Sequence, residues 1–224
     1  YALAGLLADP CHNVADMGVI PDDKQRIEDS LKQAAKSNDV IISTGGASVG
    51  EADYIKEILA SCGEVNFWKI AIKPGKPLAF GKIGSSYFFG LPGNPVSAMV
   101  TFQQLVAPAL KQLSGAVANK PLRLMATCTT AIKKAPGRQE FQRGILRQES
   151  DGQWTVGTTG DQGSGILSSM SQANCFIVLP TDQANVEAGS LVDVQLLEAQ
   201  LEGQQRARRQ RRADLGQAQG FALL

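Results

Sequence analysis

The fold is predicted mainly from one stretch of the sequence, Asp39–Tyr54, which reads D-V-I-I-S-T-G-G-A-S-V-G-E-A-D-Y. Its first five residues are a short, nearly all-apolar run, which is typical of a strand covered on both faces. Gly45 and Gly46 follow and let the backbone turn sharply and approach a ligand closely. Asp53 then opens a helical pattern with apolar positions at Ile55, Ile58 and Leu59. This order predicts a parallel α/β sheet with a ligand site at the carboxyl end of the strand.

Upstream, residues 2–8 are apolar and helix-forming, and residues 14–20 predict a short strand. Asp22 precedes a second helical pattern and, with Gln25 three residues on, fits a capping arrangement. The apolar face of that helix is Ile27, Leu31, Ala34 and Ala35. Because Tyr1 begins inside an expected helix, we expect the chain to be the C-terminal portion of a longer protein.

Two further turns follow downstream, K-P-G-K-P (Lys73–Pro77) and G-L-P-G-N-P (Gly90–Pro95). Residues 67–73 alternate as one strand, which puts Lys69 and Lys73 on one face about 13 Å apart. Two lysines at that separation suit the separated anionic groups of an extended ligand. Lys76 lies between prolines on a rigid loop. Three such turns indicate a surface that binds a phosphorylated ligand.

The third turn leads into a helix, since Asn94 is a favourable N-cap and Pro95 a favourable first residue. The N-terminus of a helix is a ready anion site. Before it, residues 78–81 and 87–90 predict a hairpin closed through residues 84–86.

From about Lys120 the pattern becomes alternating, and Asp151-Gly152 is a strong hairpin signal. We therefore predict an α/β domain over 1–117, incomplete at its N-terminus, and a small all-β barrel domain over 118–201. Residues 202–224 include R-A-R-R-Q-R-R and have no apolar period, so we expect a disordered tail.

Composition excludes several classes of protein. Apolar residues make up 43% and charged residues 19%, as in a soluble globular protein, and the net charge of +1 gives no reason to expect nucleic acid or a membrane as partner. The four cysteines form no C-x-x-C pair, so we expect reduced thiols in a cytoplasmic protein. His12 is the only histidine, which disfavours a Ser-His-Asp triad and histidine-ligated metal.

From the residues alone, each candidate also has a purely structural interpretation. Asp22 would serve only as a cap, and Asp53 only as a first-turn carboxylate facing the helix dipole. Lys69 and Lys73 would be the solvated face of an edge strand. Arg138 and Arg143, in G-R-Q-E-F-Q-R-G, would be surface residues, and Ser164, in G-D-Q-G-S-G, a loop residue.

Four motifs together carry a family resemblance: S-T-G-G-A-S-V-G-E-A-D-Y, A-I-K-P-G-K-P-L-A-F-G, G-L-P-G-N-P-V-S-A and G-R-Q-E-F-Q-R-G. In this order and spacing they resemble the bacterial molybdopterin molybdenumtransferases, the MoeA family, which also includes the E domain of gephyrin. The resemblance covers Tyr1 to about Leu201. It implies a molybdopterin-binding-like α/β domain followed by a small β-barrel.

The resemblance implies the last step of molybdenum cofactor synthesis. Adenylylated molybdopterin is bound, its pyrophosphate link is hydrolysed to release AMP, and molybdate is inserted, with Mg²⁺ as cofactor. By matching positions, Asp22 and Asp53 are the metal-binding and catalytic carboxylates, and Lys69 and Lys73 are catalytic lysines. The implied substrate-binding residues are Gly45, Gly46, Ser48, Lys76, Pro77, Asn94, Arg143 and Ser164.

The resemblance also implies a homodimer in the full-length protein. Two alternatives stay open: a fragment that binds molybdopterin without turnover, and a scaffold module like that of gephyrin, which binds partner peptides. The presence of Asp22, Asp53, Lys73 and Lys76 favours the enzyme over the scaffold, because binding to partner peptides does not need them.

Overall fold

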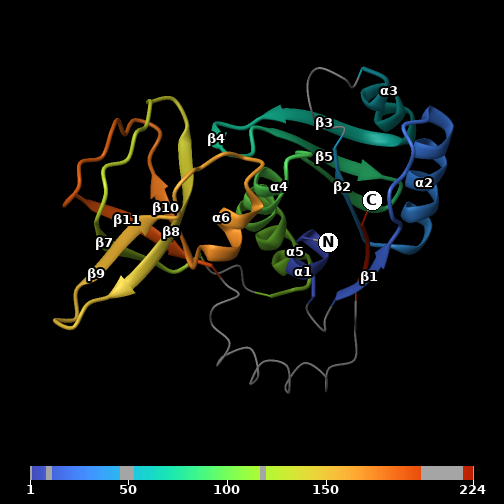
Figure 1. Cartoon of the computed structure of the whole chain (residues 1–224). Helices are drawn as coiled ribbons and strands as arrows, with labels where there is room; N and C mark the ends of the chain where they lie inside the picture. The colour runs from blue at the N-terminus through green and yellow to red at the C-terminus, as the bar shows by residue number, and fades with distance from the viewer. Residues whose placement is uncertain (1, 9–11, 46–52, 117–119, 198–218, 224) are drawn as a thin grey trace, which may run out of the picture. The chain divides into compact units, whose positions relative to one another are not determined.

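A computed structural model describes residues 2–8, 12–45, 53–116, 120–197 and 219–223 (Figure 1). The chain divides into two units. Unit 1 comprises Tyr1–Ile70, Gly75–Val117 and Gly203–Leu224, and unit 2 comprises Ala71–Pro74 and Ala118–Glu202. Unit 1 is an α/β domain and unit 2 a β-barrel, which confirms the predicted fold class.

Unit 1 is built on a six-stranded sheet in the order β1-β12-β2-β6-β5-β3. Its strands are β1 (His12–Asp16), β2 (Val40–Thr44), β3 (Gly63–Lys69), β5 (Pro77–Ile83), β6 (Ser86–Leu91) and β12 (Gln219–Leu223). The first four strands of this order are parallel to one another, and β5 and β3 add antiparallel pairings at one edge. The sheet is therefore mostly parallel, as predicted.

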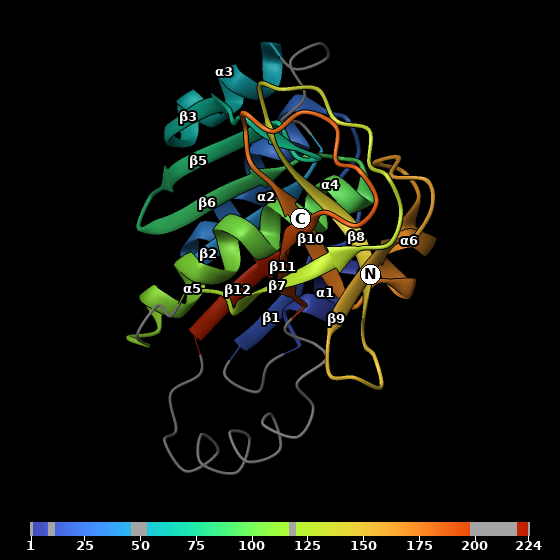
Figure 2. The same cartoon turned by 90° about the vertical axis from the view of Figure 1, so that its left-hand side faces the viewer.

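Helices cover both faces of this sheet (Figures 1 and 2). On one face lie α2 (Lys24–Ser37) and α3 (Asp53–Cys62); on the other lie α1 (Ala2–Leu6), α4 (Pro95–Thr101) and α5 (Ala107–Leu113). The apolar run of β2 supplies both layers, because Ile41 packs with the α2–α3 side and Val40 and Ile42 with the other. The near-continuous hydrophobicity of this strand follows from burial on two faces.

The start of α2 differs from the prediction by one residue. The N-cap is Asp23, whose Oδ1 accepts the main-chain N–H of Arg26 at 2.9 Å, and not Asp22. A capping carboxylate reaches the N–H three positions on, and both aspartates have a polar residue at that offset, so the pattern did not separate them. Asp22 is exposed and does not cap the helix.

The prediction of one strand over 67–73 is wrong. β3 ends at Lys69 within unit 1. After Ile70 and Ala71 the chain forms β4 (Ile72–Lys73), which pairs with the barrel strand β8 (Gln139–Gln148). Ile70 donates its N–H to Lys76 O, whereas Ala71 O accepts from the N–H of Gln139. Lys69 and Lys73 therefore belong to different sheets.

The hairpin and the helix start downstream are confirmed. β5 and β6 pair antiparallel, and Gly84 turns the chain between them with a φ of 59°. Asn94 is the N-cap of α4 and Pro95 its first residue. The helix then passes through a π-helical segment, Phe102–Val106, before α5. Pro108 lacks the N–H that would bond to Gln104 O in a regular α-helix, which accounts for the wider turn there.

The end of the chain departs from the sequence prediction. Residues 219–223, expected in a disordered tail, form β12, which lies parallel between β1 and β2. Ala222 and Leu223 are buried in the helix-covered layers on opposite faces of the sheet. The remainder of the predicted tail, 202–218 and 224, lies outside the described residues.

Unit 2 is a closed barrel of five strands. β7 (Arg123–Cys128), β8, β9 (Trp154–Thr158), β10 (Cys175–Leu179) and β11 (Leu191–Leu196) follow the order β10-β11-β7-β9-β8, and pairing of β10 with β8 closes the ring. The predicted Asp151-Gly152 turn joins β8 to β9, with Gly152 at a φ of 86°. A short helix, α6 (Leu167–Gln172), precedes β10. Among the described residues, no helix is long and apolar enough to cross a membrane.

Candidate functional site

Two of the three predicted turns lie side by side in unit 1. β2 and β6 are paired in parallel, and their carboxyl ends lie together, with Thr44 opposite Leu91. The N–H of Gly45 donates to Leu91 O at 3.2 Å, and a Cβ built on Gly93 would lie 3.7 Å from the Cα of Gly45. Gly45 has a φ of 87°, which favours glycine. The predicted Gly46 and Ser48 lie outside the described residues.

The start of α4 adjoins this pair of turns. Asn94 stands at its N-cap, but its side chain makes no capping hydrogen bond. The missing N–H of Pro95 falls where no helical partner exists, so the remaining first-turn N–H groups point out of the helix end. An anionic group at the carboxyl ends of β2 and β6 would meet main-chain donors next to Gly45 and Gly93.

The second half of the lysine turn, Gly75–Pro77, is the third component in unit 1. Gly75 has a φ of 108°, and its carbonyl accepts a long hydrogen bond, 3.5 Å, from Thr101 Oγ1 of α4. Lys69 is the cross-strand neighbour of Pro77 in the β3–β5 ladder. Lys76, next to Pro77, is exposed, as is Lys69. The structure thus brings Lys69, Lys76 and Pro77 together where β3 ends and β5 begins.

Asp22 and Asp53 stand at the starts of two helices that pack together. Asp22 lies two residues before Lys24, the first residue of α2, and Asp53 is the first residue of α3. Lys24 Nζ pairs with Glu57 Oε2, one turn into α3, at 3.1 Å. Both helix starts therefore lie in one neighbourhood of unit 1.

Arg143 is a buried cation in unit 2, not the surface residue of the structural interpretation. Only 1% of it is exposed. Its Nε donates to Ser169 Oγ at 3.0 Å and its Nη2 to Gly163 O at 3.2 Å. Its main-chain N–H donates to Gln162 Oε1 at 2.7 Å. Arg143 therefore ties strand β8 to the loop that carries Ser164.

Burial lowers the pKa of Arg143, and the charge of Asp161 opposes this effect. A guanidinium nevertheless stays protonated in proteins, so this part of the barrel holds a fixed positive charge. Both side-chain hydrogen bonds go to neutral oxygens. Within the part of the chain that the structure describes, no carboxylate forms an ion pair with Arg143, and a buried cation of this kind is well suited to attract an anion.

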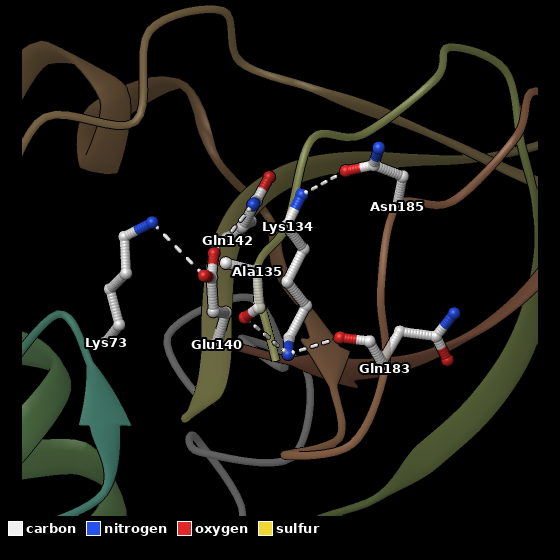
Figure 3. Close-up of polar contacts among 7 residues, drawn as sticks. All are labelled: Lys73, Lys134, Ala135, Glu140, Gln142, Gln183 and Asn185. Atoms are coloured by element: carbon white, nitrogen blue, oxygen red, sulfur yellow. Dashed lines mark hydrogen bonds and ion pairs between the residues drawn. The ribbon is translucent and has the colours of Figure 1, made fainter. Parts of the chain in front are cut away.

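Lys73, the remaining predicted lysine, forms an ion pair in unit 2. Its Nζ lies 3.1 Å from Glu140 Oε1, and Gln142 Nε2 donates to Glu140 Oε2 at 3.0 Å (Figure 3). Sequence reasoning did not single out Glu140 or Gln142. The signal available was two polar residues at i and i+2 within E-F-Q-R-G, on the same face of a strand that is buried over most of its length.

The described residues contain no group of three or more histidine, cysteine, aspartate or glutamate side chains able to hold a metal ion. Mg²⁺, however, is commonly bound by one or two carboxylates together with substrate phosphates and water. Asp22 fits that mode, since it is exposed and accepts no hydrogen bond among the described residues. The carboxylate of Asp53 lies outside what the structure describes.

Comparison with known families assigns both units. Residues 1–112 match the family described as "Probable molybdopterin binding domain", and residues 125–197 match "MoeA C-terminal region (domain IV)". The chain belongs to the MoeA family. The first match spans the three turns, the helices of unit 1 up to residue 112 and every strand of its sheet except β12; the second spans nearly all of the barrel of unit 2.

Named relatives agree with this assignment. The chain is 47% identical over 192 residues to molybdopterin molybdenumtransferase of Haemophilus influenzae, covering 85% of the chain and 48% of that protein. It is 34% identical over 208 residues to gephyrin of Dictyostelium discoideum, covering 83% of the chain and 29% of gephyrin. The MoeA-family chain thus spans about half the length of the first of these relatives.

A solved structure of the same family is also similar. The molybdopterin biosynthesis MoeA protein of Pyrococcus horikoshii superposes with a TM-score of 0.65 at 30% identity, over 80% of this chain and 42% of that one. The fold therefore agrees with the family assignment.

Proposed function

We propose that this MoeA-family chain binds adenylylated molybdopterin and takes part in the insertion of molybdate during molybdenum cofactor synthesis. The observation that carries the proposal is the close approach of the Gly45 and Gly93 turns beside the start of α4. Backbone this close, with donors facing outward, suits phosphate groups. The names of the similar proteins, molybdopterin molybdenumtransferase and molybdopterin biosynthesis protein, support the substrate class.

Most of the predicted residues that the structure describes receive a role from their position in their own unit. In unit 1, the Gly45 and Asn94 turns bind the phosphates, and Lys69 and Lys76 neutralise their charge. In unit 2, Arg143 and Lys73 supply fixed positive charge for the molybdate dianion, and Ser164 lies on the loop that Arg143 anchors. Tetrahedral oxyanions are well bound by lysine, arginine and hydroxyl donors.

The reaction proposed is hydrolysis of the pyrophosphate link. Water attacks a phosphorus atom, the P–O bond of the anhydride breaks, and AMP leaves. Negative charge builds on both phosphates, so fixed cations and in-line placement supply most of the catalysis. Asp22 and Asp53 would hold Mg²⁺, which would neutralise phosphate charge when bound. We further propose that the complete protein acts as a homodimer in the cytoplasm.

Calorimetric titration of the chain with adenylylated molybdopterin tests this function. We expect binding that weakens about tenfold or more in Lys76→Ala, because a hydrogen bond to a charged group is lost. Lys36→Ala, an exposed lysine in the last turn of α2, is the matched control and should bind like the parent chain.

A second measurement, AMP release in the presence of Mg²⁺ and molybdate, separates turnover from binding. Asp22→Asn should abolish AMP release. It should leave the fold intact, because Asp22 is exposed and the cap of α2 is Asp23. Binding without release in the parent chain would favour the non-catalytic alternative. No binding by the folded parent chain would contradict the proposed function.

A further inference from the structure

Glu140 is a buried carboxylate whose ion-pair partner is Lys73. The side chain of Glu140 is 4% exposed, whereas that of Lys73 is 46% exposed. The two residues are direct neighbours in the parallel pairing of β4 with β8. Because both are on paired strands, the backbone fixes the position from which each side chain starts.

Both oxygens of this carboxylate are held. Oε1 accepts from Lys73 Nζ at 3.1 Å, and Oε2 accepts from Gln142 Nε2 at 3.0 Å. Gln142 is also buried and lies on the same face of β8, two residues further on. Rotation of the carboxylate would break one of the two hydrogen bonds, so its orientation is set within unit 2 alone.

The nearby buried lysine does not take the place of Lys73. Lys134 Nζ donates to Gln183 O at 2.8 Å and to Ala135 O at 3.3 Å, as Figure 3 shows. Its main-chain N–H is bound by Asn185 Oδ1 at 2.9 Å. Among the residues that the structure describes, Glu140 therefore has one cationic partner, Lys73.

This arrangement leaves the Lys73 ammonium fixed but available. An ammonium group has three N–H donors, and Glu140 accepts from one of them. The half-exposed side chain keeps the others for solvent or a ligand. A lysine ordered in advance loses less rotamer freedom on binding an anion than one that moves freely.

We propose that Glu140, held by Gln142, is a positioning residue that orders Lys73 for the anionic substrate. Glu140 acts through Lys73 and does not touch the substrate. The inference rests on the proposed function, since it assigns Lys73 to binding of the oxyanion. A purely structural ion pair would hold the barrel together without any effect on ligand binding.

The first experiment measures the order of Lys73 without any ligand. The whole chain is labelled with acetic anhydride, and the acylation rate of Lys73 is followed by peptide mass spectrometry. Glu140→Gln should raise this rate about fivefold, a factor at the upper end of what a partly exposed ion pair contributes. Glu149→Gln makes the same chemical change at an exposed glutamate of the same unit and should leave the rate unchanged. An unchanged Lys73 rate in Glu140→Gln would overturn the inference.

The second experiment asks whether that order serves binding. Affinity for adenylylated molybdopterin is compared in the parent chain, Lys73→Gln, Glu140→Gln and the double variant. Lys73→Gln keeps a donor toward Glu140, so the carboxylate is not left unpaired. We expect Glu140→Gln to weaken binding about fivefold in the parent and to have no further effect beside Lys73→Gln.

The possible outcomes separate this inference from the function on which it rests. If Glu140→Gln weakens binding equally in the parent chain and beside Lys73→Gln, Glu140 has a structural role independent of Lys73, and the inference is overturned. If Glu140→Gln instead binds more tightly than the parent, Glu140 only reduces the charge of Lys73, and the inference is also overturned. No binding by the parent chain would overturn the proposed function and, with it, this use of Lys73. Binding by the parent that Glu140→Gln leaves unchanged would overturn the inference alone.

Discussion

At the scale of single residues, the barrel of unit 2 contains charges in unusual places. Arg143 is almost fully buried and donates to a serine hydroxyl and a carbonyl instead of a carboxylate. Glu140, three residues earlier, is buried with its partner Lys73 half-exposed. Buried charges cost free energy unless they are paired and hydrogen-bonded. Both charges meet this condition, since Arg143 donates two side-chain hydrogen bonds and Glu140 is paired with Lys73 and accepts from Gln142.

Cys175, on the strand next to Arg143, gives a prediction of pH dependence. Burial raises the pKa of its thiol from 9.0 to about 12, against a smaller opposing effect of main-chain hydrogen bonding at Leu146. Below pH 9 the thiol is protonated in both the folded and the unfolded chain. Between pH 9 and 12 only the unfolded thiol ionises, so the free energy of unfolding falls as the pH rises. From pH 8 to pH 10 we expect Cys175 to contribute a loss of about 1.4 kcal/mol.

Urea unfolding of the parent chain and of Cys175→Ala at pH 8 and pH 10 checks this value. Other groups that titrate in the range contribute equally to both proteins, so the difference between them isolates Cys175. The variant should be less stable at pH 8, because a buried atom is removed, and should lose less stability than the parent on going to pH 10. Parallel pH profiles for the two proteins would contradict the prediction.

Residue roles were partly predictable from the sequence. Turn glycines and Asn94-Pro95 stood out, since each has a local conformational reason to be there. The cap was assigned to Asp22 instead of Asp23, because a carboxylate one position earlier satisfies the same local pattern. Glu140 was missed because its importance comes from Lys73, a residue far away in the sequence that only the paired strands bring into contact.

At the scale of elements, β12 shows what a local pattern cannot predict. Its five residues carry no strand signal of their own that separates them from the tail before them. The position between β1 and β2 makes them a strand, because both neighbours offer unpaired backbone groups and a buried apolar environment. The same holds for the split of residues 67–73 into β3 and β4, which is set by pairing with β5 and β8. The hairpins closed at Gly84 and Gly152 were predictable, since their turn residues act locally.

The position of β12 predicts a local loss of hydrogen-exchange protection. β1 is an edge strand paired with β12, whereas β2 also pairs with β6. Leu223→Ala removes a buried contact of β12 and should cost about 2 to 5 kcal/mol. Amides of β1 should then exchange at least about tenfold faster than in the parent, and the factor should be larger for them than for the amides shared by β2 and β6. Exchange followed by mass spectrometry distinguishes the two strands.

Val19→Ala serves as the control for that measurement, because Val19 is in the same unit and is 98% exposed. It should leave the exchange of β1 amides unchanged. Equal protection of β1 in the parent chain and in Leu223→Ala would show that β12 does not support the sheet edge.

At the scale of the whole molecule, the two units have separate cores. Unit 1 has two apolar clusters, one on each face of the sheet, and a third cluster fills the barrel. Their buried members are all different residues. The chain nevertheless passes from one unit to the other several times, because β4 leaves the α/β domain to join β8 and the chain returns at Gly75. Separate cores favour independent unfolding, and these repeated crossings favour coupled unfolding.

The two tryptophans of the chain allow these tendencies to be compared, since Trp68 lies in unit 1 and Trp154 in unit 2. Trp154→Phe leaves a chain that reports on the sheet, and Trp68→Phe one that reports on the barrel. Because the clusters share no residue, we expect Leu223→Ala to lower the urea midpoint seen by Trp68 by about 1 to 2 M and to leave that seen by Trp154 unchanged. Ile177→Ala, in the barrel core, should do the reverse. Equal shifts at both tryptophans in both variants would show instead that β4 couples the units into one cooperative transition.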